Sequence, residues 1–247
     1  MTTSLIYGCE TWGTSTVNSI EVTYRHGLKR SLSVRETTNT EIVYIEANRL
    51  PLNIRITKQQ LNFWIKLQSY LNKNPNHPLK DLIEQGLSMN LPYLKYYKNL
   101  EASYITPKNC ENTLTTVFRA NNRTNITTKA NNDPDSRFGV YLLVNPNLSS
   151  PAQNYATFEF ERVLLTRYRS GSHNLRIETG RLCCPKIPRE NRTCLCELGI
   201  QSIRHCLFEC PLLREVVQRV EFTTLEEAFN SPDFVNMLMD IERVLKI

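Results

Sequence analysis

The sequence has no long hydrophobic run. No stretch approaches the roughly 20 consecutive apolar residues that a membrane-spanning helix needs, and the first residues lack the charged and then apolar segments of a secretory signal. We therefore expect an intracellular protein, nuclear or cytoplasmic, without a membrane partner. Four glycosylation sequons carry no weight in such a compartment; they begin at Asn122, Asn125, Asn147 and Asn191.

Signatures of common enzyme classes are also absent. The sequence contains no glycine-rich phosphate loop, no Gly-x-Ser-x-Gly elbow, no His-Glu-x-x-His motif and no paired aspartates of a polymerase palm. Asp133-Pro134-Asp135 is interpreted as a structural turn rather than a cation site. We expect neither catalysis nor a small-molecule substrate.

The charge is mildly positive, with 30 basic and 24 acidic residues and a net charge of +6. Residues 1–100 hold twelve Lys and Arg against seven Asp and Glu, whereas residues 197–247 hold five against nine. A polyanion is therefore expected to meet the earlier part of the chain, although so mild an excess permits nucleic-acid binding without requiring it.

Helical periodicity dominates the pattern of apolar residues. Residues 17–34 repeat an apolar residue every fourth position and carry Arg25, Lys29 and Arg30 elsewhere on the wheel, which predicts an amphipathic helix with a basic face. Residues 55–71 carry two apolar stripes, 61/64/65 and 63/67/70, and are expected to be a core helix. Further helices are expected at 40–48, 78–86, 91–100, 154–169, 202–220 and 225–245, the last interrupted near Pro232.

The middle of the chain is less regular. Residues 113–135 are rich in Thr and Asn and have poor periodicity, which predicts a linker or a loosely ordered loop. Residues 138–144 form a short apolar run that is either a strand or a buried helical segment.

Cysteine is concentrated late in the chain. Of eight cysteines, five fall within residues 183–206 and Cys210 follows closely, which in a reducing compartment indicates metal rather than disulfides. Cys194, Cys196, His205 and Cys210 form a three-thiolate, one-imidazole set that can close a tetrahedral zinc site. The alternatives are that these cysteines are small core residues, or that Cys184 or Cys206 replaces one ligand. His205 and Cys210 are expected to converge if a helix begins between them, and Pro211 suits a helix start.

Arginines surround the cysteine-rich segment. Arg167, Arg169, Arg176, Arg181 and Arg192 are candidate phosphate contacts, with a solvated face that forms internal salt bridges as the alternative. Tyr168 is interpreted as a core or interface tyrosine, with stacking on a base as the alternative.

Several ordered motifs carry a family resemblance. Residues 5–13 (LIYGCETWG) resemble the segment after the palm of LINE-type (non-LTR) retrotransposon reverse transcriptases, and residues 28–35 (LKRSLSVR), 43–44, 49–52 (RLPL) and 62–64 (NFW) resemble the thumb-like region that follows it. Residues 169–181 (RSGSHNLRIETGR) and 205–211 (HCLFECP) resemble the lead-in and the Cys/His module at the C-terminus of these polyproteins. The Cys194/Cys196 pair is one residue closer than is usual in this group.

The helical periodicity predicts a mainly α fold, and together with the resemblance it divides the chain into three parts. These are a thumb-like helical region at 1–100, a poorly defined linker or loop region at 101–150, and a basic helix, Cys/His module and C-terminal helices at 151–247. The resemblance also implies a parent RNA-directed DNA polymerase whose catalytic aspartates precede this chain. We expect a non-catalytic, zinc-stabilised remnant that binds RNA or DNA. The alternatives are a metal-free helical protein-interaction module, associating through the stripe around Phe63 and Trp64, and a decaying, non-functional fragment.

Overall fold

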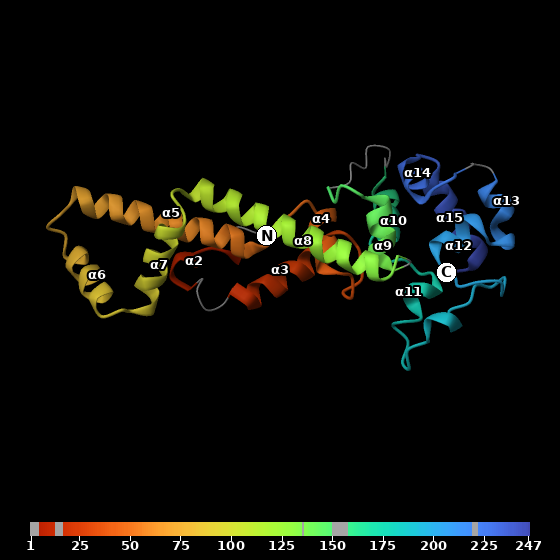
Figure 1. The fold of residues 1–247 in the computed structure, drawn as a ribbon, viewed down its shortest axis with the longest axis horizontal. Helices are drawn as coiled ribbons and strands as arrows, with labels where there is room; N and C mark the ends of the chain where they lie inside the picture. Colours follow the sequence, from red (N-terminus) through yellow and green to blue (C-terminus); the bar gives the residue numbers. More distant parts are fainter. Residues whose placement is uncertain (1–4, 13–16, 135, 150–157, 219–221) are drawn as a thin grey trace. The chain divides into compact units, whose positions relative to one another are not determined.

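The computed structural model describes residues 5–12, 17–134, 136–149, 158–218 and 222–247. Across these ranges the chain is helical without a β-strand (Figure 1), and its one ladder-like pairing is the isolated antiparallel bridge between Thr193 and Ile200. The prediction of a mainly α fold that carries a Cys/His cluster is confirmed. No described helix is both long and apolar enough to cross a membrane.

The described helices agree with most of the predicted ones, with shifted ends. Their bounds are α2 Cys9–Trp12, α3 Val17–Ser31, α4 Thr40–Glu46, α5 Leu52–Lys73, α6 Pro78–Ser88, α7 Pro92–Ser103, α8 Pro107–Asn132, α9 Arg137–Val144, α10 Glu159–Arg169, α11 Arg176–Thr179, α12 Ile203–Phe208, α13 Arg214–Val217, α14 Leu225–Asn230 and α15 Phe234–Leu245, with 3-10 turns η1 Arg189–Asn191 and η2 Pro211–Leu213. Residues 154–157 of one predicted helix, 219–220 of another, Asp135 and Gly13 lie outside the described residues.

The chain divides into two compact units. The first comprises residues 1–27 and 49–122, and the second comprises residues 28–48 and 123–247, so that α3 and α8 each contribute to both. The three-part division at residues 100 and 150 stays a prediction.

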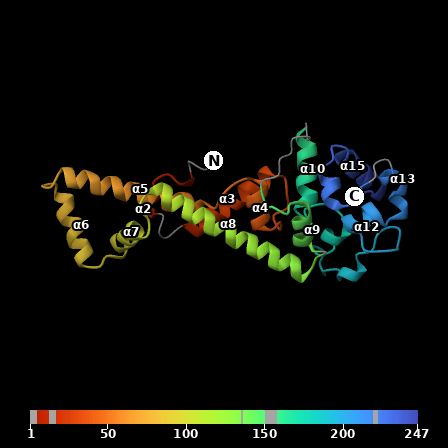
Figure 2. The same ribbon diagram turned by 45° about the horizontal axis from the view of Figure 1, so that its top comes forward.

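Helix α5 forms the centre of the first unit, as expected of a core helix. The predicted stripe 61/64/65 faces inward with Leu61 and Trp64 buried, whereas Phe63 and Tyr70 of the stripe 63/67/70 are exposed. Helices α2 and α7 pack on α5 (Figures 1 and 2). Trp64 of α5 is 2% exposed, stacks on Tyr97 of α7 at a centroid distance of 5.3 Å, and donates from Nε1 to Glu101 at 2.7 Å. The N-terminus of α5 is held by Glu21, whose carboxylate accepts from the backbone N–H of Leu52 at 2.8 Å.

The burial of Trp64 bears on the alternative of self-association through the stripe around Phe63 and Trp64. Phe63 and Tyr70 are 39% and 50% exposed, but Trp64 belongs to the core of the first unit. A stripe formed by Phe63 and Trp64 together is therefore not a surface in this structure.

The linker predicted at 113–135 is wrong over most of its length, because residues 107–132 form the single helix α8. Its inward positions recur every fourth residue, and they include Cys110 and Asn122 as well as Ile126 and Ala130. Ile126 packs with Ile42 and Tyr141 inside the second unit. Of these four positions only Asn122 is polar, and it interrupts an apolar row that Cys110, Ile126 and Ala130 otherwise form.

The second unit contains the larger core. Helices α9, α10, α13 and α14 pack around its interior with α15, whose Phe234, Leu238 and Ile241 are buried. Residues 138–144, open between strand and helix in the sequence, belong to helix α9. Ser136 caps this helix by accepting from the Gly139 N–H at 3.3 Å. Tyr168 is 1% exposed, which confirms it as a core tyrosine.

Candidate metal centre

The two cysteines of the first pair lie on a tight turn. The backbone N–H of Cys194 donates to the carbonyl of Gly199 at 2.7 Å, and that of Glu197 donates back to the Cys194 carbonyl at 3.0 Å. Glu197 adopts a left-handed conformation with φ of 62°. The bridge between Thr193 and Ile200 closes the base of the turn. The two thiols are thereby held at the tip of a short, hydrogen-bonded knuckle.

The other two candidate ligands flank the end of a short helix. His205 lies on α12, whose N-terminus is capped by Ser202 accepting from the His205 N–H at 3.1 Å. Cys210 follows the end of α12, and its own N–H donates to the His205 carbonyl at 2.8 Å. The expectation that a helix begins between His205 and Cys210 is wrong, because α12 ends there; the next helical turn, η2, does begin at Pro211.

These elements bring the four predicted ligands together. One ligand atom from each of Cys194, Cys196, His205 and Cys210 lies within 4.8 Å of all the others. The sulfurs of Cys194 and Cys210 are 3.7 Å apart, and Cys196 Sγ is 3.2 Å from His205 Nε2. Tetrahedral zinc with ordinary bond lengths separates two sulfurs by about 3.8 Å, and a sulfur from a nitrogen by about 3.6 Å. The cluster can therefore hold a metal ion such as zinc.

The two alternative ligands are not members of the cluster. Cys184 is exposed, next to the exposed Cys183. Cys206 lies on α12 and is 1% exposed within the core of the second unit, where burial raises the pKa of its thiol. Cys9 and Cys110 are buried in the first unit. The spacing that predicted the ligands thus selects the same four residues as the structure.

The thiols of the cluster have unequal acidity. Burial raises the pKa of Cys196, but hydrogen bonds from the Leu198 N–H, His205, Cys194 and Cys210 outweigh it and lower the pKa to about 7. Burial, together with the neighbouring Cys194, raises the pKa of Cys210 to about 12. Metal binding needs thiolates, so an ion bound by this cluster would displace the Cys210 proton and would be held more weakly as the pH falls.

Two further residues support the imidazole, and the sequence analysis missed both. The Nδ1 atom of His205 lies 3.4 Å from Glu209 Oε2, on the side of the ring away from the thiols. Gly199 packs against the same ring, since a Cβ at this position would lie 2.9 Å from His205 Nδ1. The four-residue offset between His205 and Glu209 was the available signal for the carboxylate, because it places the two on one side of a helix. No sequence pattern indicated the glycine.

No protein-family model, curated protein or solved structure matches the chain. The case for function therefore rests on the residues themselves.

Several of the candidate phosphate-contacting arginines have internal roles. Arg169 is 4% exposed and forms an ion pair at 2.9 Å with Glu46, which is equally buried. Arg181 pairs with Glu178 at 2.5 Å, and the Arg192 guanidinium donates to the carbonyls of Ile177 and Ile187. For these three residues the structure matches the alternative of internal pairing, and we leave them out of any nucleic-acid surface.

The remaining candidates are more accessible. Arg167 and Arg176 are exposed, and Arg176 donates to the Thr193 carbonyl at 3.2 Å. Arg25 lies on α3 within the first unit, whereas Lys29 and Arg30 belong to the second. Asp133 of the expected turn pairs with Arg189 at 3.0 Å, in agreement with a structural role.

Proposed function

We propose that this chain is a non-catalytic nucleic-acid-binding protein stabilised by one zinc ion, and that it derives from the C-terminal region of a LINE-type reverse transcriptase. The four ligands on the knuckle and around α12 supply every position of a tetrahedral site. Structural zinc sites are closed in this way, whereas catalytic sites keep one position for water or substrate. Zinc bound by these residues would join the knuckle, which carries Cys194 and Cys196, to His205 and Cys210 around α12. Cys194 and Cys210 belong to the core of the second unit.

The observation that supports nucleic-acid binding is a cluster of cations brought together from distant parts of the sequence. The Arg167 guanidinium donates from Nε to the Ser33 carbonyl at 2.8 Å, so α10 lies beside the turn that follows α3. A hollow of about 300 Å³ at this place is lined by Arg162, Ser31 and Leu32, and also by the carboxylate residues Glu46 and Glu159. The cations that we assign to nucleic-acid binding lie around this hollow rather than within it, apart from Arg162. We define the basic patch as Lys29, Arg30, Arg162 and Arg167.

The basic patch is suited to phosphates rather than to bases. Arg30 is 84% exposed at its side chain, and its ion pair with Glu36 is long, at 4.0 Å. Arg162 and Arg167 are exposed on α10. Cations of this kind gain affinity by releasing condensed counterions from the nucleic-acid backbone, so their contribution falls as salt rises and is independent of sequence.

Elemental analysis of the reduced, freshly purified protein tests the metal, and we expect about one zinc per chain. Binding to duplex DNA and single-stranded RNA across a salt series tests the patch. The variants Arg30→Gln and Arg162→Gln are each expected to reduce the slope of log affinity against log salt concentration by the amount that corresponds to about one phosphate contact. Arg243→Gln is the control, since Arg243 is equally exposed, at 78%, on α15. Absence of salt-sensitive binding at low salt would rule out the proposal.

A further inference from the structure

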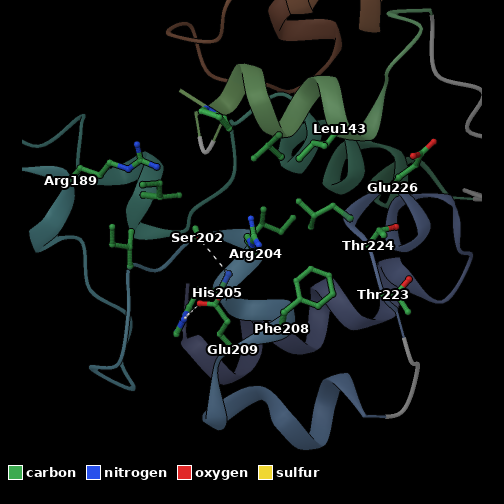
Figure 3. Close-up of a pocket in the computed structure, with 16 residues that line it drawn as sticks. Leu143, Arg189, Ser202, Arg204, His205, Phe208, Glu209, Thr223, Thr224 and Glu226 are labelled. Carbon is green, nitrogen blue, oxygen red and sulfur yellow. Dashed lines mark hydrogen bonds and ion pairs between the residues drawn. The ribbon is translucent and has the colours of Figure 1, made fainter. Parts of the chain in front are cut away.

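A large pocket lies beside the metal centre, within the second unit. Its volume is about 840 Å³, which is in the range of sites that enclose ligands of nucleotide size. Its walls come from α9, α12 and the start of α14, and His205 and Glu209 form part of its rim on the metal side (Figure 3). We call it the α12 pocket.

About half of the residues that line the α12 pocket are apolar. Val140, Leu143, Ile177, Ile203 and Leu225 line it, and Phe208 adds an aromatic ring that is 40% exposed. Leu143 is also exposed, at 55%, although it faces this pocket rather than standing alone on the surface. A half-exposed ring over apolar walls offers a planar ligand a face on which to stack.

One cation of the α12 pocket has no hydrogen-bond or ion-pair partner among the residues that the structure describes. Arg204 lies one helical turn before Phe208, so the two side chains share a face of α12, and Figure 3 shows both at the pocket. Within the described ranges, no acceptor or carboxylate engages the Arg204 guanidinium. By contrast, Arg189 also lines the pocket but is paired with Asp133. Figure 3 shows Arg189 and Glu226 at opposite ends of the lining.

The charges of the α12 pocket argue against a plain polyanion as its ligand. Glu209 and Glu226 also line it, so its two arginines face two carboxylates. A site with balanced charge gains little from counterion release, and its affinity must come mainly from stacking and apolar contact. A ligand that combines a planar, weakly polar ring with one phosphate matches Phe208 and Arg204 together.

We infer that the α12 pocket binds an unpaired nucleotide, with the base stacked on Phe208 and the adjoining phosphate on Arg204. This inference rests on the proposed nucleic-acid binding and specifies it: the basic patch contacts the backbone of any nucleic acid, whereas the α12 pocket selects strands with unstacked bases. A paired base within a duplex cannot enter, since its faces are covered by its neighbours.

The test compares a single-stranded oligonucleotide with a duplex of equal length on the zinc-loaded protein. Phe208→Ala is expected to weaken single-strand binding by about tenfold, because removing one aromatic stacking partner typically has an effect of this order. Duplex affinity and the salt dependence of binding are expected to stay unchanged. Phe208→Trp keeps a stacking surface and is expected to bind as the wild type does.

Two controls keep this test separate from that of the basic patch. Zinc content and melting temperature of Phe208→Ala establish that the variant is folded, and Arg204→Gln is expected to reproduce its selective loss without removing any apolar surface. Equal binding of single strands by Phe208→Ala, Arg204→Gln and wild type would overturn the inference while the basic patch stands. If wild type bound neither strand form, the proposed function and the inference would both fail.

Discussion

The Nδ1 atom of His205 lies 3.4 Å from the Oε2 atom of Glu209, while the Nε2 atom of the same ring lies 3.2 Å from Cys196 Sγ. The ring thus contacts a carboxylate with one nitrogen and the thiol cluster with the other. A carboxylate in this position fixes the tautomer of a metal-bound imidazole and raises its basicity.

Glu209→Gln is therefore expected to weaken zinc binding. The loss should be about tenfold, at the lower end of the range for such residues, because Glu209 is 58% exposed and water replaces part of its effect. Competition with a chelator measures the change. Glu226→Gln is the matched control, since Glu226 is exposed on α14 and not within the metal cluster. Equal zinc affinity in wild type and Glu209→Gln would show that Glu209 does not support the site.

Gly199→Ala is expected to disturb the same imidazole by direct contact. The added Cβ would lie 2.9 Å from Nδ1 and 3.1 Å from Cε1 of His205, and that side chain is only 4% exposed, so the ring cannot swing away freely. We expect less bound zinc and a lower melting temperature. Leu198→Ala, at a neighbouring position that is 75% exposed, should change neither. Full zinc content in Gly199→Ala would mean that the knuckle shifts to make room.

Cys210→Ser is expected to lower zinc content and melting temperature together, because the free energy of metal binding is part of the free energy of folding in such a site. Cys206→Ala tests the neighbouring cysteine, which lies in the core outside the cluster, and should keep its zinc. Cys9→Ser and Cys110→Ser, in the first unit, should also keep theirs. The zinc content of each purified variant decides which thiols are ligands. If Cys206→Ala lost its zinc and Cys210→Ser kept it, Cys206 rather than Cys210 would be the fourth ligand.

The four candidate ligands could be predicted from sequence because a chelating cluster of this kind is local. All four fall within 17 residues, and the order of thiol and imidazole residues is itself the signal. The residues that support them act through shape instead. Gly199 matters because a ring packs on it, and the α12 pocket forms from α9, α12 and α14, whose approach no local spacing encodes.

Helix α8 shows the same limit in the fold. Its inward positions recur every fourth residue, but the polar Asn122 interrupts them, and its exposed positions are rich in Thr and Asn, which disfavour helices in isolation. Packing of Ile126 against Ile42 and Tyr141 outweighs that local preference. Helix α5 could be predicted from its sequence because its apolar residues recur at helical spacing along most of its length.

Arg169 is expected to matter for stability rather than for nucleic-acid binding. Its guanidinium and the Glu46 carboxylate are 4% and 1% exposed, so removing either leaves a buried charge. Arg169→Ala should lower the free energy of unfolding by about 3–5 kcal/mol, and Arg169→Met combined with Glu46→Leu should recover most of it. Urea denaturation measures both. Arg162→Ala, exposed on the same helix, should change stability by no more than about 0.5 kcal/mol. A similarly small loss in Arg169→Ala would show that water reaches the pair.

His173 is expected to make the fold less stable in mild acid. It is 5% exposed and stacks on Tyr168 at 4.8 Å, and burial, assisted by the nearby Arg35 charge, lowers its pKa from 6.5 to about 3. Below pH 6.5 the His173 imidazole is protonated in the unfolded chain but stays neutral in the folded chain down to about pH 3. The free energy of unfolding therefore falls as the pH falls from 6.5 toward 3. At about pH 5.5 the loss from this group alone should be about 1.4 kcal/mol relative to about pH 7.5.

The variant His173→Phe keeps an aromatic ring but cannot titrate, so its loss of unfolding free energy over the same interval should be smaller than that of the wild type by this amount. Urea denaturation of both proteins at both pH values, with equal zinc content, cancels the titration of the metal ligands. Parallel losses in the two proteins would mean that His173 is protonated in the fold.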